Sequence, residues 1–243
     1  MLANDKRTCY NQNQEKEIER RRKIEQPILI VMLTKDDVTV KNAKEIFLEA
    51  KDAPCQYWGF KEVGLPPEEM KDLVQCMKAA GKTTFLEIVG KTEEECLRPV
   101  ELAAECGFDA VTGTVYYDSI LEVIKKHNIL YIPFIGERFT LNMSGTIEEL
   151  TAEARELSRK EGVAGINIAA FRYNGDVEKM VYAVKDAVEK PICCVGSVNS
   201  YERLDMIKKF SPWYFTIGSA FFDKKFGETF TEQIVNVQNY LKK

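Results

Sequence analysis

Eight short apolar runs recur along the chain, and longer segments with helical spacing separate them. Several of these runs are nearly continuous stretches of Val, Ile, Leu, Phe and Ala, which is typical of parallel strands covered on both faces. An open doubly wound sheet more often stops at about five to seven strands, whereas eight strand–helix units complete a barrel. We therefore predict an α/β protein with a (β/α)8 TIM barrel over residues 27–243. Its predicted strands are residues 28–33, 56–63, 83–89, 108–112, 129–135, 163–169, 192–195 and 213–217.

The first turns of several predicted helices are marked in the sequence. Residues 92–95 and 146–149 both have the Thr-x-x-Glu pattern of a capping box, in which side chains bind the free amides at a helix start. Asn199 stands three residues before Glu202 in a similar arrangement. These patterns predict helices that begin shortly after a strand, as a barrel requires.

Residues 1–26 differ from the rest of the chain. Between residues 15 and 25 only Ile18 and Ile24 are uncharged, and residues 20–23 form a basic run. Such a segment is typical of a solvated helix or a tail. We predict a charged N-terminal helix or tail in front of the barrel.

The composition limits which binding partners and which cellular compartment we expect for the protein. Nucleic-acid backbones are bound by clustered lysine and arginine, so the net charge of −4 argues against such a partner, although a small anion needs only a local site. No apolar run approaches the ~20 residues that cross a bilayer. The seven cysteines include no C-x-x-C pair, which favours reduced thiols over disulfides or a zinc site. We expect a cytoplasmic protein without a membrane partner.

Two predicted strands end in the same dipeptide. Gly196 and Ser197 follow the seventh strand, and Gly218 and Ser219 follow the eighth. In TIM barrels the loops after these two strands frequently bind phosphate. Glycine allows close approach of the backbone, and the amides and serine hydroxyls supply donors. These four residues form the predicted phosphate site.

The same segments resemble a known group of proteins. Residues 195–199, Val-Gly-Ser-Val-Asn, and residues 217–221, Ile-Gly-Ser-Ala-Phe, resemble the phosphate grip of the ribulose-phosphate-binding barrels. That superfamily includes pentulose-phosphate epimerases, phosphoribosyl isomerases, and the pair formed by hexulose-phosphate synthase and keto-gulonate-phosphate decarboxylase. The resemblance covers the predicted barrel and implies a TIM barrel with a phosphorylated ligand. In many members the first loop has two glycines, whereas here a single glycine precedes Ser197.

Glu87 is the most unusual residue in the predicted strands. It lies within an apolar strand, where a carboxylate is costly unless it is paired, hydrogen-bonded, neutral or bound to a metal. A catalytic role in proton transfer is one explanation. A buried ion pair with a lysine such as Lys61 is the other.

Residues 62–64, Glu-Val-Gly, resemble the end of the second strand in the synthase and decarboxylase pair. That resemblance implies a magnesium ion held by Glu62 and Glu87, and oxygen ligands suit this ion. Those enzymes have an Asp-x-Lys-x-x-Asp pattern in strand three, whereas residues 87–92 here are Glu-Ile-Val-Gly-Lys-Thr. Their specific proton chemistry is therefore not implied. No organic cofactor is predicted.

Other catalytic groups are few. The one histidine, His127, lies at a predicted helix end before the fifth strand, which places it at the opposite end of the barrel from a TIM-barrel site. Lys35 and Lys61 are candidates for an imine-forming lysine. We rank that chemistry below proton transfer by carboxylates.

Three polar residues are candidates for substrate binding. Arg138 and Arg172 follow the fifth and sixth predicted strands and suit a second anionic group, carboxylate or phosphate. Asn167 lies within the sixth strand, where its amide binds either a substrate hydroxyl or the core.

The leading hypothesis is an enzyme that acts on a small phosphorylated sugar or sugar-acid through an enediolate-type intermediate, as an isomerase, epimerase or lyase. In this hypothesis Glu62 and Glu87 transfer protons or hold a divalent metal ion. The alternative is a non-catalytic sensor that resembles the glycerol-phosphate-responsive antiterminators, and a degenerate barrel kept for assembly is a third option. Exposed aromatic pairs, Tyr116 with Tyr117 and Phe221 with Phe222, leave a homo-oligomer possible.

Overall fold

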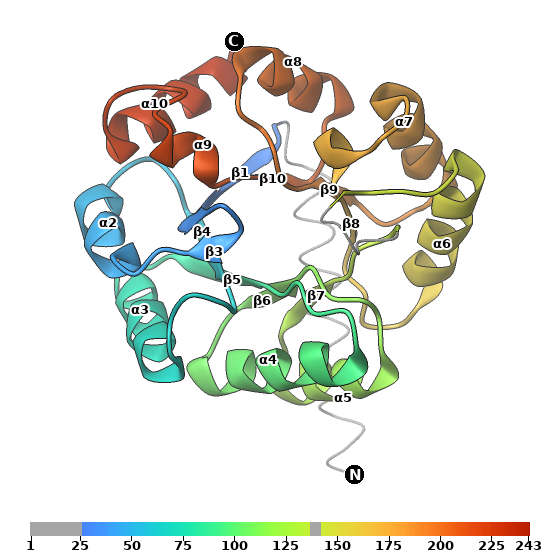
Figure 1. Ribbon diagram of the computed structural model, residues 1–243, viewed down its shortest axis with the longest axis horizontal. Coiled ribbons are helices and arrows are strands. Elements are labelled where there is room, and N and C mark those ends of the chain that lie inside the picture. The colour runs from blue at the N-terminus through green and yellow to red at the C-terminus, as the bar shows by residue number, and fades with distance from the viewer. Residues whose placement is uncertain (1–25, 137–141) are drawn as a thin grey trace.

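Eight parallel strands form a barrel in the computed structural model, which describes residues 26–136 and 142–243 (Figure 1). The strands follow one another around the barrel in the order β7-β6-β5-β4-β1-β10-β9-β8. Each predicted strand is present at the expected place, so the predicted fold is confirmed. The barrel strands are β1 (Ile28–Met32), β4 (Tyr57–Lys61), β5 (Thr83–Glu87), β6 (Ala110–Thr112), β7 (Leu130–Ile132), β8 (Ile166–Ile168), β9 (Ile192–Cys194) and β10 (Tyr214–Ile217).

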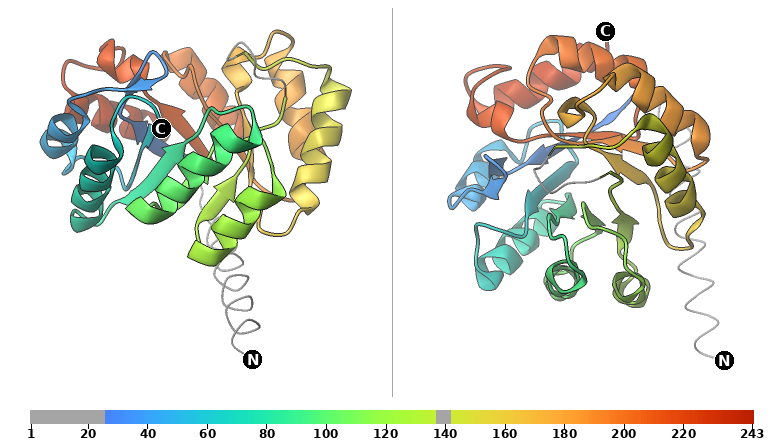
Figure 2. Two further views of the ribbon diagram at one scale, coloured as in Figure 1. Left: turned by 60° about the horizontal axis from the view of Figure 1, so that its bottom comes forward. Right: turned by 45° about the vertical axis from the view of Figure 1, so that its right-hand side comes forward.

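Helices surround the strands on the outside of the barrel (Figures 1 and 2). They are α2 (Ala43–Ala50), α3 (Pro67–Ala79), α4 (Glu93–Cys106), α5 (Asp118–His127), α6 (Ile147–Arg159), α7 (Val177–Ala187), α8 (Tyr201–Phe210), the short α9 (Ser219–Phe222) and α10 (Phe230–Leu241), with a 3-10 turn, η1 (Ala170–Arg172). None of these helices is long and apolar enough to cross a membrane.

Capping chemistry determines where several helices begin. Thr92 and Glu95 form a reciprocal capping box at α4, as predicted. Thr146 and Glu149 form the predicted capping box at α6. The start of α8 differs from the prediction by one residue. Ser200 is the N-cap and its hydroxyl accepts the amide of Arg203, so Asn199 remains in the loop and lines the cleft described below.

The barrel interior contains a small polar network within an apolar core. The Tyr214 hydroxyl donates to Asn167 Oδ1 over 2.9 Å and lies 2.8 Å from Thr112 Oγ1, and the Asn167 amide in turn donates to Thr112 Oγ1. These three residues are fully buried or nearly so. They connect β6, β8 and β10 across the barrel, while β7 and β8 are joined only by isolated bridges.

A short hairpin, absent from the prediction, follows the first barrel strand. It consists of the antiparallel strands β2 (Thr34–Lys35) and β3 (Val38–Thr39). Its two turn residues, Asp36 and Asp37, have φ angles of 50° and 63°, the left-handed combination that lets a two-residue turn match the twist of its strands. The hairpin lies inside the ring of helices in Figure 1, at the carboxyl end of the barrel.

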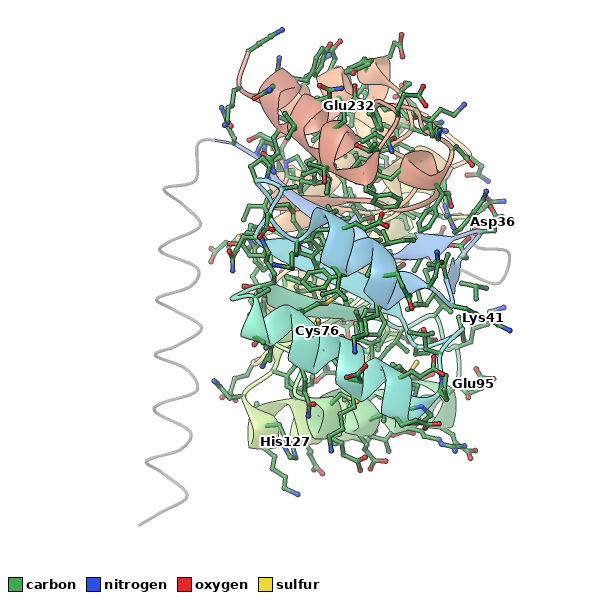
Figure 3. All side chains as sticks on the ribbon, turned by 90° about the vertical axis from the view of Figure 1, so that its left-hand side faces the viewer. Asp36, Lys41, Cys76, Glu95, His127 and Glu232 are labelled. Carbon is green, nitrogen blue, oxygen red and sulfur yellow. The ribbon has the colours of Figure 1, made fainter. Side chains whose placement is uncertain are left out.

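Figure 3 shows the two ends of the barrel from the side. Asp36 and Glu95 mark the end that carries the strand-to-helix loops, and His127, the last residue of α5, lies toward the other end. The position of His127 agrees with the prediction. The six cysteines in the described part of the chain form no disulfide with one another.

The charged segment predicted for residues 1–26 lies outside the described residues, apart from Gln26. The domain boundary at residue 27 therefore stays a prediction.

Candidate active site

A cleft opens at the carboxyl ends of the strands, where TIM barrels carry their chemistry. Its walls come from loops that are far apart in sequence. The lining residues are Met32, Thr34, Asp37, Lys61, Glu87, Val89, Phe134, Ala169, Arg172, Val195, Gly196, Ser197, Val198, Asn199, Thr216, Gly218, Ser219, Ala220 and Asp223. All four residues of the predicted phosphate site are among them.

Gly196 brings the loop after β9 close to Arg172. Its φ of 76° is in the left-handed region, and a Cβ at this position would lie 3.0 Å from Arg172 Nε. The Gly196 amide donates to Thr216 Oγ1 over 3.1 Å. The next residue, Ser197, is also left-handed, with a φ of 60°. This tight bend turns the loop so that it lines the cleft.

Gly218 is required for a different reason. A Cβ there would lie 2.7 Å from Thr34 Oγ1 and 2.9 Å from the Thr34 carbonyl oxygen, which is closer than a side-chain carbon can approach. The Ser219 hydroxyl accepts the amide of Asp36 over 3.0 Å, so its own proton is left to donate to a ligand. Two strand-end loops and the hairpin therefore meet at one place.

Two further lining residues, Lys61 and Glu87, form an ion pair. They occupy matching positions on the neighbouring strands β4 and β5, and Lys61 Nζ lies 3.5 Å from Glu87 Oε1. The Lys61 side chain is 4% exposed and that of Glu87 is 12% exposed. The structural alternative proposed for Glu87, a pair with Lys61, is therefore present, and the pair faces the cleft.

Asp37 is a third member of this cluster. Lys61 Nζ donates to Asp37 Oδ1 over 2.7 Å, and the two terminal nitrogens of Arg172 donate to Asp37 Oδ2 and Oδ1 over 3.1 and 3.2 Å. Arg172 Nε also donates to the Ser197 hydroxyl over 3.2 Å. Arg172 therefore connects the charged cluster to the predicted phosphate loop.

The pKa of Asp37 reflects these contacts. Partial burial by itself raises the pKa, but the hydrogen bonds and positive charges of Lys61 and Arg172 outweigh burial and lower the pKa below its ordinary value. Asp37 is therefore a carboxylate at neutral pH.

Two predicted catalytic residues, Glu62 and Lys35, are not among the residues that line the cleft. Glu62 Oε1 accepts the amide of Val89 over 2.8 Å. Its Oε2 is buried and meets no hydrogen-bond partner among the described residues, and burial raises the pKa of the Glu62 carboxyl. Lys35 points to the surface, where its Nζ lies 3.5 Å from Asp223 Oδ1. Only Lys61 of the two predicted lysines lines the cleft.

The substrate-binding predictions have three different outcomes. Arg172 lines the cleft, whereas Asn167 is fully buried below it and binds Tyr214 and Thr112. The core role that the sequence left open for Asn167 is the one its contacts show. Arg138 lies outside the described residues.

Both carboxyl groups of the predicted magnesium site already have protein partners. Glu87 is paired with an ammonium group, and Glu62 accepts the backbone amide of Val89. Within residues 26–136 and 142–243, no group of three or more His, Cys, Asp or Glu side chains is placed to share a metal. Magnesium stays a prediction from the resemblance.

Sequence reasoning missed Asp37 as a site residue. It lies nine positions after the start of the first strand, and its role depends on the turn that carries it over the cleft. The paired acids Asp36 and Asp37 between two short β-rich segments were a hairpin signal, because Asp tolerates the left-handed conformation.

The fold and the site together define a (β/α)8 barrel with a charged cleft beside two glycine–serine loops. No family model matches the chain, and no curated protein matches it. Solved structures do match. The chain is similar to tryptophan synthase from M. tuberculosis, with 13% identity, a TM-score of 0.64, and coverage of 92% of this chain and 96% of that one.

Two further solved structures are named for phosphorylated compounds. One is thiamine phosphate pyrophosphorylase from Pyrococcus furiosus, with 13% identity, a TM-score of 0.59, and coverage of 90% and 96%. The other is N-acetylmannosamine-6-phosphate 2-epimerase from Clostridium perfringens, with 13% identity, a TM-score of 0.58, and coverage of 81% and 88%. At these identities the likeness shows the fold alone, a (β/α)8 barrel.

Proposed function

We propose that the protein is an enzyme that acts on a small phosphorylated sugar or sugar-acid through an enediolate-type intermediate, as an isomerase, epimerase or lyase. The observation that carries this proposal is the position of the Lys61–Glu87 pair. It faces the same cleft as Gly196, Ser197, Gly218 and Ser219. A phosphate held by the loops would leave the carbon chain of the substrate beside the pair.

The pair supplies the two groups that enediolate chemistry requires. Glu87 would remove a proton from the carbon next to a substrate carbonyl, so that the C–H bond breaks, an O–H bond forms on Glu87, and the electron pair moves to the carbonyl oxygen. Lys61, as an ammonium group, would stabilise the resulting oxyanion. Return of the proton to the same or the neighbouring carbon gives an epimer or an isomer. A lyase reaches the same intermediate by breaking a C–C bond.

Lys61 is better placed for this role than for imine formation. Its Nζ already contacts two carboxylates, Asp37 at 2.7 Å and Glu87 at 3.5 Å, whereas an imine requires Nζ to attack a substrate carbon. Replacement of Lys61 by Arg, which keeps the charge and cannot form an imine, would therefore retain part of the activity.

The direct test is exchange of substrate protons with solvent. The protein would be incubated in D2O with ribulose 5-phosphate, dihydroxyacetone phosphate or another sugar phosphate, and loss of the proton next to the carbonyl would be followed by NMR. We expect exchange by the wild type and a loss of about 10²- to 10⁴-fold in Glu87→Gln. Glu101→Gln, an exposed change on α4, is the matched control.

Two outcomes would contradict the proposal. Exchange by Glu87→Gln at the wild-type rate would remove Glu87 from the chemistry. Binding of sugar phosphates without exchange or turnover would instead support the non-catalytic sensor.

The phosphate loops have their own test. Gly218→Ala places a methyl group against Thr34, so we expect loss of thermal stabilisation by inorganic phosphate. A Gly218→Ala protein that is folded and is stabilised by phosphate as strongly as the wild type would exclude this loop as the phosphate site.

A further inference from the structure

We propose that Lys61 and Arg172 form a second anion subsite, which Asp37 occupies until a substrate carboxylate displaces it. This inference rests on the proposed function and narrows its substrate class to short phosphorylated carboxylic acids. Asp37 then acts as an internal substitute for the substrate carboxylate.

The geometry of the subsite is that of a carboxylate receptor. Arg172 binds both oxygens of Asp37 through its two terminal nitrogens, at 3.1 and 3.2 Å, and Lys61 Nζ adds a third contact at 2.7 Å. A forked guanidinium that meets both oxygens is the preferred arrangement for recognition of a free carboxylate. Lys61 is almost fully buried, so its charge is poorly screened and strongly favours an anion at this place.

Asp37 is attached to an element that can release it. The side chain lies at the tip of the β2–β3 hairpin, where the φ of 63° places Asp37 in the left-handed region. The neighbouring hairpin residues Lys35, Asp36 and Val38 are exposed. Withdrawal of Asp37 therefore does not disturb the buried core of the barrel.

The charge balance also requires a displacement. With Asp37 in place, the cluster has two cations, Lys61 and Arg172, and two anions, Asp37 and Glu87. A ligand anion would then enter a neutral cluster, at a place already filled. When Asp37 leaves, the remaining three side chains have a net positive charge, and a carboxylate restores neutrality.

The distance to the phosphate loops determines the length of the ligand. Arg172 Nε lies 3.2 Å from the Ser197 hydroxyl, while the terminal nitrogens of the same side chain bind Asp37. One guanidinium group therefore separates the phosphate site from the carboxylate subsite. Only a short carbon chain between phosphate and carboxylate fits this spacing.

The test compares two isosteric changes in the same turn. Asp37→Asn removes the competing charge, and Asp36→Asn removes an equal charge from the adjacent, exposed residue. Binding of 2-phosphoglycolate and 3-phosphoglycerate, which carry both anionic groups, would be measured by calorimetry. Inorganic phosphate and glycerol 3-phosphate, which lack the carboxylate, are the reference ligands.

We expect Asp37→Asn to bind one or both carboxylate ligands at least about tenfold more tightly than the wild type, with a change of less than about twofold for the reference ligands. Asp36→Asn should resemble the wild type. An equal change for all four ligands, or weaker binding of the carboxylates, would overturn the subsite while phosphate binding still supports the proposed function. Failure of all three proteins to bind any of the ligands would overturn both proposals.

Discussion

The ion pair of Lys61 with Asp37 contributes to the stability of the barrel as well as to the candidate site. Lys61 is nearly buried, and its two carboxylate partners come from the hairpin and from β5. Removal of one partner would leave a buried charge without full compensation, which is costly. The stability of the barrel should therefore report on this cluster without any substrate.

Asp37→Asn should lower the free energy of unfolding at pH 7 by about 2 kcal/mol, since a hydrogen-bonded carboxylate is replaced by a neutral amide. The pKa of Asp37 is lowered by folding, so its contribution is complete above the unfolded pKa near 4 and is lost as the pH falls through the lower folded pKa. The difference between wild type and variant should shrink below about pH 4. Urea unfolding between pH 3 and 7 measures it, with Asp36→Asn as control. A difference that is constant across this range would show that the carboxylate is not stabilised by folding.

Folding shifts the pKa of Glu62 in the opposite direction from that of Asp37. Burial raises the pKa of Glu62, so folding favours the protonated carboxyl, and the wild type loses stability as the pH rises through that raised pKa. Glu62→Gln keeps an oxygen to accept the amide of Val89 and removes the charge. We expect this variant to be more stable than the wild type at pH 8, on the order of 1 kcal/mol, with a smaller difference at pH 4. Chemical denaturation at the two pH values measures it. A larger gain at pH 4 than at pH 8 would contradict the assignment, and Glu101→Gln is the matched control.

Among the elements, α4 shows how local sequence places a helix beside the site. Thr92 Oγ1 accepts the amide of Glu95 over 3.3 Å, and Glu95 Oε2 accepts the amides of Thr92 and Lys91 over 3.1 and 2.9 Å. The pKa of Glu95 is lowered because these backbone amides bind its carboxylate. This capping box lies at the end of the loop that follows β5, the strand whose last residue is Glu87.

Thr92→Ala should destabilise the protein by about 1 kcal/mol, because the N-cap hydroxyl is lost, whereas Thr92→Ser should remain close to the wild type. Thermal and urea unfolding of the two variants provide the comparison. Equal stability of the Ala and Ser variants would show that the capping hydroxyl contributes nothing.

The whole molecule depends on closure of the barrel. Between β7 and β8 the bridges are isolated, and the network of Thr112, Asn167 and Tyr214 crosses the interior near this seam. Loss of the Tyr214 hydroxyl would leave the buried Asn167 Oδ1 without its donor and would leave Thr112 Oγ1 bound only to the Asn167 amide.

Tyr214→Phe removes only the hydroxyl from this network. We expect a loss of about 1–3 kcal/mol in the free energy of unfolding, with little change in m-value. Tyr201→Phe, at a tyrosine that is 38% exposed, is the matched control. If Tyr214→Phe unfolds at the wild-type denaturant concentration, the network does not stabilise the barrel.

Much of the fold and part of the candidate site were predictable from the sequence. The eight strands, the capping boxes of α4 and α6, and the convergence of Gly196, Ser197, Gly218 and Ser219 were all predictable. Each depends on a periodic or local pattern, and the closed barrel then brings the ends of its strands to one edge. The Lys61–Glu87 pair was also foreseen, as the alternative to catalysis.

Other features were decided by tertiary structure alone. Residues 61 and 62 are adjacent in sequence, yet strand alternation directs Lys61 into the cleft and leaves Glu62 outside its lining. The role of Asp37 depends on a two-residue turn that carries it to Arg172, 135 positions away. The sequence by itself therefore determined the barrel and the place of its site, because repeated patterns encode local structure. Only the fold decided which charges meet, because their partners come from distant segments and a one-residue change in strand phase reverses the face.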